Sequence, residues 1–297
     1  MKISIKNILN KKRLGQKITM LTAYDYPLAV LIDRAGINMI LVGDSLANVV
    51  LGLDSTQKVG MAEMLHHAKA ARRGVKRALL IADMPYRSYA NEKLAVKNAK
   101  RFIREAGCDG VKLEWFDNCG KIAKAIVKSG IPVMGHVGLT PQTAKAFKVQ
   151  GVTAEGAKRI AENAEVLEKA GCFSIVIECV PDKVAKLITK TLKIPTIGIG
   201  AGGDCDGQVL VIHDILGLTD GFHPRFIKQY VNSCNIILKA ARRYRFDVVK
   251  KKFPSSKNIF HIKDDEFKKF QILLGLSRLN TIPVSLRAMN HHGSWGG

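Results

Sequence analysis

The sequence has 297 residues, 47 % of them hydrophobic, which is enough for one large domain or two small ones. Lysine and arginine number 47 against 25 acidic residues, so the formal net charge is +22. No apolar run approaches the ~20 residues of a membrane-spanning helix, so we expect no membrane partner. The six cysteines form no C-x-x-C pair. This argues against a disulfide framework or a zinc knuckle and favours reduced thiols in a cytoplasmic protein.

The excess positive charge raises the question of a nucleic-acid partner. The lysines, however, are spread along predicted helices such as "AVKNAKRFIREAG" and "GKIAKAIVKSG", and aromatic residues make up only 6 % of the sequence. We therefore interpret the lysines as solvated helix faces and expect no nucleic-acid partner. A basic nucleic-acid-binding protein is kept as an alternative, and its affinity would fall steeply with salt.

The chain begins with a basic stretch, "MKISIKNILNKKRLGQKI", which lacks the serine enrichment and the small-residue cleavage site of a transit peptide and predicts an N-terminal helix. Eight short apolar runs then predict strands at Thr19–Ala23, Asn38–Gly43, Ala78–Asp83, Gly110–Glu114, Ile131–His136, Phe173–Glu178, Pro195–Gly200 and Gln208–His213. Between most of these runs, apolar residues recur at intervals of three and four, as in "EGAKRIAENAEVLEKAG". This spacing predicts amphipathic helices.

Strands that alternate with helices predict βαβ units and a parallel sheet. Eight such units in about 230 residues indicate the α/β class and a (β/α)8 TIM barrel, here with an N-terminal helix. A doubly wound open sheet is the alternative, but no G-x-G-x-x-G follows the first predicted strand. We expect the barrel to span residues 1–260. Residues 261–297 are expected to form a poorly ordered C-terminal extension with one helix-like piece.

Four of the predicted strands end at or just before an acid, namely Asp44, Asp83, Glu114 and Glu178. Because every strand of a parallel barrel points its C-terminal end at one face, these side chains should converge there. Crowded carboxylates repel one another unless a cation neutralises them, and Mg²⁺ often takes one or two protein carboxylates. A helix N-cap is the alternative for a single acid such as Asp44. Four acids at the same topological position favour a metal site.

Two basic residues belong to the same predicted face. His136 ends the fifth predicted strand in "GHVGLTPQ", and Lys112 lies two residues before Glu114. In a strand, residues two apart face the same way. A lysine that points into a barrel is costly unless it meets an anion. Lys112 and His136 are therefore predicted to lie among the acids.

At these residues the sequence resembles the ketopantoate hydroxymethyltransferase (3-methyl-2-oxobutanoate hydroxymethyltransferase) family. The resemblance extends from Ile18 to Phe260, nearly the whole predicted barrel. The matching stretches include "TAYDYPLA", "LVGDSLANVVLGLDST", "IADMPYRSY", "GVKLE", "PVMGHVGLTPQ", "VIECVP" and, the longest, "IPTIGIGAGGDCDGQVLVIHDILGL". Their order and spacing agree with those of the family.

The resemblance implies a barrel enzyme that assembles as a homo-oligomer, a decamer of two stacked rings. It implies Mg²⁺-dependent transfer of a hydroxymethyl group from 5,10-methylenetetrahydrofolate, as co-substrate, to 3-methyl-2-oxobutanoate. The product would be 2-dehydropantoate, an intermediate in pantothenate and coenzyme A biosynthesis. Removal of the C3 proton of a 2-oxo acid requires a polarised carbonyl and a base that reaches C3, and the acids above have the right types for both tasks.

The resemblance also implies a role for each residue. It assigns Mg²⁺ to Asp44 and Asp83, with Glu114 reaching the ion mainly through water. Glu178 falls where the family has its proposed base. Besides the two aspartates, the implied substrate-binding residues are Ser45, Lys112 and His136.

Some positions depart from the family pattern. Trp115 and Phe116 stand where the family has glycines after the metal-site glutamate, and Ala47 stands where glycine is common. The loop after Gln142, "TAKAF", is shorter than in the family. Because this loop would border the active site, we expect altered substrate binding or loop closure.

Two other barrel chemistries are kept as alternatives. The phosphoenolpyruvate mutase and isocitrate lyase group also binds 2-oxo acids through Mg²⁺, but "GHVGLTPQ" does not resemble the lid motif of that group. A class I aldolase would use Lys112 as a Schiff-base nucleophile. Borohydride trapping and insensitivity to EDTA would reveal it.

Overall fold

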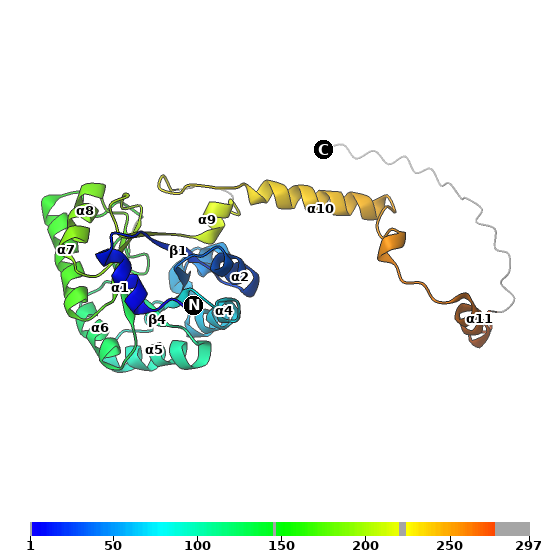
Figure 1. The fold of residues 1–297 in the computed structure, drawn as a ribbon, viewed down its shortest axis with the longest axis horizontal. Coiled ribbons are helices and arrows are strands. Elements are labelled where there is room, and N and C mark those ends of the chain that lie inside the picture. The colour runs from blue at the N-terminus through cyan, green and yellow to red at the C-terminus, as the bar shows by residue number, and fades with distance from the viewer. Residues whose placement is uncertain (1, 145–146, 220–223, 277–297) are drawn as a thin grey trace. The chain divides into compact units, whose positions relative to one another are not determined.

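The computed structural model describes residues 2–144, 147–219 and 224–276. The chain divides into two compact units, Met1–Ile236 and Ile237–Gly297. The first unit is a closed barrel of eight strands in the order β1 to β8, ringed by helices (Figure 1). The (β/α)8 barrel predicted from the sequence is therefore confirmed.

All neighbouring strands of the barrel run parallel. Each of the eight predicted strands overlaps an observed one. The observed strands are β1 (Ile18–Thr22), β2 (Met39–Val42), β3 (Leu79–Asp83), β4 (Gly110–Glu114), β5 (Val133–Gly138), β6 (Ser174–Glu178), β7 (Thr196–Ile199) and β8 (Gly207–Leu210). The apolar runs thus mark the strands, and those at β2, β3 and β4 are buried on both faces.

The outer layer consists of six amphipathic helices, which follow one another around the barrel (Figure 1). They are α2 (Tyr26–Arg34), α4 (Met61–Gly74), α5 (Glu92–Ala106), α6 (Cys119–Lys128), α7 (Ala154–Lys169) and α8 (Asp182–Thr191). Two shorter helices, α3 (Leu46–Val49) and η1 (Thr56–Lys58), lie between β2 and α4, and a third, α9 (Ile212–Leu216), follows β8. Three of the six long helices begin at side-chain caps: the side chains of Asp25 before α2, Asn91 before α5 and Thr153 before α7 accept from backbone N–H groups.

The predicted N-terminal helix is α1 (Ile5–Arg13), which is capped by Ser4. Ile8 of α1 is fully buried and packs with side chains from the barrel interior, among them Met20, Met39, Ile81 and Met134. Just before α1, the N–H of Ile3 donates to the carbonyl of Arg77 (2.7 Å), ahead of β3. Helix α1 therefore closes the N-terminal end of the barrel, and the opposite end carries the strand-end acids.

The C-terminal part of the chain contains α10 (Ser233–Val249), η2 (Ser256–Asn258) and α11 (Asp264–Leu273). The helix-like piece predicted in the extension corresponds to α11. Neither α10 nor α11 buries a residue in the described part of the chain. Residues 277–297, most of the predicted extension, lie outside the described residues. The domain boundary at residue 260, the poor order of the extension and the decamer stay predictions.

No helix in the described ranges is long and apolar enough to cross a membrane.

Candidate active site

A pocket of about 450 Å³ lies at the C-terminal ends of the strands. All seven site residues predicted from the sequence line it, although they come from loops and strands far apart in the chain. They are Asp44, Ser45, Asp83, Lys112, Glu114, His136 and Glu178. Strand-end position was therefore a sound guide to which side chains meet.

The strand register explains how these side chains meet. Asp83 of β3 is paired with Lys112 of β4, and Glu114 of β4 is paired with His136 of β5. Lys112 and Glu114 are two residues apart, so their side chains leave the same face of β4. Neighbouring strands thus present opposite charges to one another across the pocket floor.

Asp83 is the centre of the first charge cluster. The ammonium of Lys112 donates to Asp83 Oδ1 (2.6 Å), and the backbone N–H of Asp44 donates to Asp83 Oδ2 (3.1 Å). Gly43 permits this approach, since a Cβ there would lie 2.8 Å from Ser45 Oγ and 3.4 Å from Asp83 Oδ2. Burial disfavours the charged ammonium, but the carboxylates of Asp83, Glu114 and Asp44 outweigh burial and raise the pKa of Lys112. Lys112 is therefore a charged anchor.

His136 forms the second cluster, between two glutamates. Its Nδ1 lies 3.5 Å from Glu114 Oε1, and its Nε2 lies 3.2 Å from Glu178 Oε2. Burial and the charge of Lys112 oppose protonation, but the two glutamates outweigh them and raise the pKa of His136 to about 9. Both contacts are at ion-pair distance without the direction of a good hydrogen bond. The imidazolium therefore holds Glu178 beside the pocket mainly by charge.

Among the strand-end residues that line the pocket, four carboxylates outnumber two cationic side chains, Lys112 and His136. Burial, followed by the charges of Asp83 and Glu114, raises the pKa of Asp44 well above its usual value. In contrast, the pKa of Glu114 is lowered. Burial would raise this pKa, but it is outweighed by His136, by the charge of Lys112 and by the hydrogen bond from the backbone N–H of Gln142. The surroundings of Asp44 therefore oppose its ionisation, whereas those of Glu114 favour it.

The donor set fits a hard divalent cation. Asp44 and Asp83 supply two buried carboxylates that line the same pocket, and a cation would offset the neighbouring negative charges that help to raise the pKa of Asp44. Among the described residues, no three His, Cys, Asp or Glu side chains gather as a metal site. A site built on two carboxylates, with water and substrate supplying the other ligands, agrees with both observations. Direct or water-mediated binding by Glu114 stays a prediction.

The sequence reasoning missed Gln142 as a site residue. Its side-chain Nε2 donates to Asp44 Oδ2 (2.7 Å), and its backbone N–H donates to Glu114 Oε2 (2.9 Å). The hydroxyl of Tyr89 donates to Gln142 Oε1 (2.5 Å). Neither residue carries charge, and both lie in loops. Their only sequence signals were their places in "GLTPQ" and "DMPYRSY".

Ser45 is held by a second residue that the sequence reasoning did not single out. The hydroxyls of Tyr24 and Ser45 lie 2.8 Å apart. Burial raises the pKa of Tyr24, so its phenol stays neutral and can bond Ser45. Tyr24 belongs to "TAYDYPLA", just after β1.

The two bulky departures from the family pattern lie outside the pocket. The Trp115 side chain faces a separate hollow near α6 and α7, with Asn118 and Val166. The ring of Phe116 meets the ring of Tyr89 edge to face, with centroids 5.5 Å apart. Ala47 is fully buried in α3. None of these three side chains fills the space that a substrate would need.

The shortened loop after Gln142 includes residues 145 and 146, which lie outside the described residues. Its described end, Phe147 to Val149, lines the pocket. The altered binding or closure expected from the loop stays a prediction.

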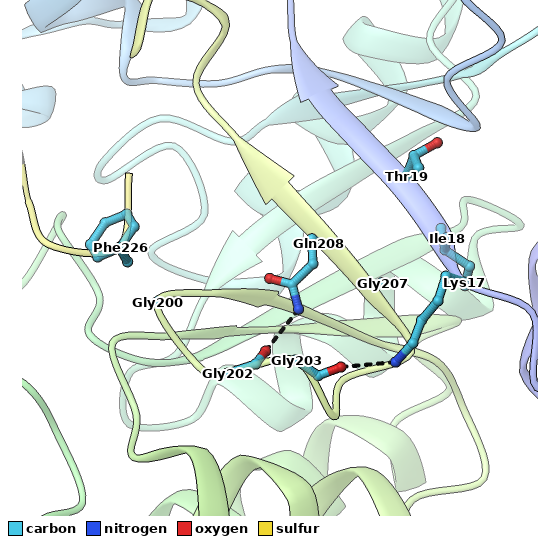
Figure 2. Close-up of a pocket in the computed structure, with 9 residues that line it drawn as sticks. All are labelled: Lys17, Ile18, Thr19, Gly200, Gly202, Gly203, Gly207, Gln208 and Phe226. Carbon is cyan, nitrogen blue, oxygen red and sulfur yellow. Dashed lines mark hydrogen bonds between the residues drawn. The ribbon is translucent and has the colours of Figure 1, made fainter. Parts of the chain in front are cut away.

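A second hollow, of about 480 Å³, lies beside β7, β8 and the start of β1 (Figure 2). Residues 200–206, all described, connect β7 to β8 without a helix. The ammonium of Lys17 donates to the carbonyl of Gly203 (2.9 Å), and the amide of Gln208 donates to that of Gly202 (2.8 Å) (Figure 2). These polar groups hold the glycine-rich connection. This hollow is slightly larger than the pocket at the strand ends, but no acidic side chain lines it. We therefore assign the chemistry to the acidic pocket.

A closed parallel barrel whose strand ends bring acids, a buried lysine and a histidine around one pocket defines the class of (β/α)8 barrel enzymes. The family model for ketopantoate hydroxymethyltransferase matches residues 2–256. The chain belongs to this family of transferase enzymes, as the sequence motifs predicted.

Relatives named 3-methyl-2-oxobutanoate hydroxymethyltransferase match over most of their length. The protein from Syntrophobacter fumaroxidans is 52 % identical over 258 residues, which are 86 % of this chain and 92 % of the relative. The protein from Syntrophomonas wolfei is 48 % identical over 268 residues, or 89 % of this chain and 97 % of the relative. A Clostridium botulinum protein is 50 % identical over 273 residues, or 91 % and 99 %.

Solved structures support the fold at much lower identity. Phosphonopyruvate hydrolase in complex with oxalate and Mg²⁺ has a TM-score of 0.56 and 16 % identity, covering 91 % of this chain and 98 % of that one. The 2,3-dimethylmalate lyase of the phosphoenolpyruvate mutase and isocitrate lyase superfamily has a TM-score of 0.55 and 12 % identity, covering 93 % and 100 %. This likeness concerns the barrel alone.

Proposed function

We propose that this protein transfers a hydroxymethyl group from 5,10-methylenetetrahydrofolate to 3-methyl-2-oxobutanoate, giving 2-dehydropantoate. The observation that carries the proposal is the acidic pocket. Two adjacent aspartates, Asp44 and Asp83, lie at one side, and the carboxylate of Glu178, held by His136, reaches the same space. The names of the relatives agree with this reaction.

The residues of the chain suit the enolisation of a 2-oxo acid. Lys112 uses one of its three N–H bonds on Asp83, and the others, with the hydroxyl of Ser45, are available to the substrate carboxylate. Glu178, with its side chain 17 % exposed, is within reach of a bound ligand and would accept the C3 proton as general base. His136 would keep the carboxylate of Glu178 aimed at C3.

We assign the metal to Asp44 and Asp83, with Glu114 acting mainly through water. Bound there, Mg²⁺ would supply a Lewis acid that polarises the 2-oxo group of the substrate. Lys112 would hold the Asp83 carboxylate in place. The bond from Gln142 would do the same for Asp44.

The size and lining of the pocket support a larger co-substrate. A pocket of about 450 Å³ falls within the roughly 300–1,000 Å³ typical of sites for drug-sized ligands, and a five-carbon acid fills only part of it. Its outer part is apolar and basic, with Phe147, Val149 and Phe226 beside Lys148 and Arg225. Aromatic and cationic side chains suit a planar ring system that carries carboxylates, as in a folate.

We expect Phe226→Leu to separate the two substrates kinetically. Loss of aromatic stacking, which contributes about 0.5–1.5 kcal/mol, should raise the KM for 5,10-methylenetetrahydrofolate roughly threefold to tenfold. The KM for 3-methyl-2-oxobutanoate should stay near its original value. Leu187→Ala is the control, because Leu187 is an exposed residue of α8 that does not line the pocket. Equal KM values for the folate in both variants would remove Phe226 from the folate site.

The proposed reaction is tested by following the transferred carbon with a ¹³C label. The protein is mixed with 3-methyl-2-oxobutanoate and 5,10-methylenetetrahydrofolate carrying ¹³C in the one-carbon unit, with Mg²⁺ or with EDTA. We expect ¹³C NMR to show labelled 2-dehydropantoate with Mg²⁺ and none with EDTA. A folded, Mg²⁺-loaded protein that forms no labelled product would contradict the proposed function.

The environment of Lys112 argues against the class I aldolase alternative. A Schiff base forms through a neutral amine, whereas the neighbouring carboxylates raise the pKa of Lys112 against the effect of burial. Its ammonium is also bonded to Asp83 at 2.6 Å. We therefore assign Lys112 to binding and not to covalent catalysis.

A further inference from the structure

Gln142 contacts two of the carboxylates assigned to the metal site, although it does not itself line the pocket. We propose that Gln142 is a positioning residue that orients Asp44 and Glu114, and that Tyr89 fixes its amide. The inference rests on the proposed function, since it concerns the same site. Its test measures Mg²⁺ affinity and not product formation, so the inference can fail while the proposed reaction holds, and the reverse.

The orientation of the Gln142 amide is fixed by its partners. Tyr89 donates to Oε1 (2.5 Å), and Nε2 donates to Asp44 Oδ2 (2.7 Å) and to the carbonyl of Met84 (3.0 Å). Both amide hydrogens and the amide oxygen therefore have partners of the correct kind. The reversed amide would place its oxygen against a carboxylate and a carbonyl. With only 1 % of the residue exposed, no water competes for these bonds.

Tyr89 closes the network on the other carboxylate. Its hydroxyl oxygen accepts from the backbone N–H of Glu114 (3.3 Å) while its hydrogen goes to Gln142. The backbone N–H of Gln142 in turn donates to Glu114 Oε2 (2.9 Å). Phe116 packs against the ring of Tyr89. The residue that departs from the family pattern therefore supports this network.

A neutral amide suits this position for an electrostatic reason. Asp44 is one of the two carboxylates assigned to the metal, and it lies next to Asp83. A lysine or arginine in place of Gln142 would neutralise Asp44 and compete with a bound cation. An amide stabilises the carboxylate through hydrogen bonds and leaves its charge available to the metal. Groups that orient metal ligands in this way typically affect metal affinity or activity by about 10–100-fold.

Gln142 also links the site to two loops. Its backbone carbonyl accepts from the side chain of Gln57 (2.8 Å), in η1 between β2 and α4. The shortened loop begins directly after it, and the described end of that loop, Phe147 to Val149, lines the pocket. Gln142 therefore connects the carboxylates of the site to Gln57.

The test measures Mg²⁺ affinity by isothermal titration calorimetry on Gln142→Met and Tyr89→Phe. Gln142→Met keeps the length of the side chain, and Tyr89→Phe keeps the ring on Phe116. We expect Mg²⁺ affinity to fall about 10–100-fold in Gln142→Met and by a smaller factor in Tyr89→Phe. Tyr86→Phe, a neighbouring tyrosine outside the network, is the matched control and should bind Mg²⁺ as the wild type does.

The double variant distinguishes positioning from general damage. If Tyr89 acts through Gln142, the combined loss in Gln142→Met with Tyr89→Phe should be smaller than the product of the single losses. Melting temperatures identify variants that fail to fold, and Tyr89→Phe keeps the test decisive if Gln142→Met is one of them. Mg²⁺ affinity within twofold of wild type in a folded variant of either residue would overturn the proposal. A wild type that binds Mg²⁺ but makes no product would refute only the proposed reaction.

Discussion

Asp83→Ala is expected to weaken Mg²⁺ binding by on the order of 100-fold or more and to stop hydroxymethyl transfer. Removing a group that only orients a ligand already costs about 10–100-fold, and Asp83 is assigned as a ligand. Its loss also leaves the buried ammonium of Lys112 and the backbone N–H of Asp44 without their partner. Calorimetric Mg²⁺ titration and the ¹³C transfer assay measure the two effects on the same sample.

Two companion variants show whether that loss arises from the charge. Asp83→Asn keeps the shape but not the charge, so it should also lose Mg²⁺ binding, and Asp44→Ala should do the same. Asp204→Ala is the control, since Asp204 is a half-exposed acid paired with Lys186. Wild-type Mg²⁺ affinity in Asp83→Asn or in Asp44→Ala would place the metal elsewhere.

Glu178→Gln should slow exchange of the C3 proton of 3-methyl-2-oxobutanoate by about 10²–10⁴-fold, the usual contribution of a general base. The amide keeps the size of the side chain but cannot accept the proton. Because Glu178 is assigned to the base and not to the metal, Mg²⁺ affinity should stay near the wild-type value. NMR of the substrate in D₂O measures the exchange, and calorimetry measures the affinity.

Glu165→Gln provides the control for Glu178→Gln, because Glu165 is an exposed residue of α7 paired with Lys169. Exchange at the wild-type rate in Glu178→Gln would assign the base to another residue. Loss of Mg²⁺ binding in Glu178→Gln would instead make Glu178 a metal-site residue.

The sequence predicted the fold well because its signals are local. Buried parallel strands appear as short apolar runs, such as that ending at Val42, and helices appear through three- and four-residue spacing. The β7–β8 connection breaks the repeat, since residues 200–206 run between the strands without a helix. In α10 and α11 the helical pattern is present, but these helices bury no residue within the described part of the chain.

The site was predictable only where topology determines position. Asp44, Asp83 and Glu178 could be grouped because parallel strands end at one face. Gln142 and Tyr89 could not, because the path of a loop depends on tertiary contacts that spacing does not encode. The side chains of Trp115 and Phe116 illustrate the same limit. Both follow a strand-end acid where the family has glycines, yet their side chains lie outside the pocket.

The most direct measurement of the central claim is C3 proton exchange of 3-methyl-2-oxobutanoate in D₂O, followed by NMR with Mg²⁺ and then with EDTA. This half-reaction needs the acids of the pocket and the metal but not the folate. We predict exchange that is enzyme-dependent with Mg²⁺ and disappears with EDTA. A folded, Mg²⁺-loaded protein that leaves the C3 proton in place, or one that exchanges it equally well in EDTA, would contradict the role assigned to the acidic pocket.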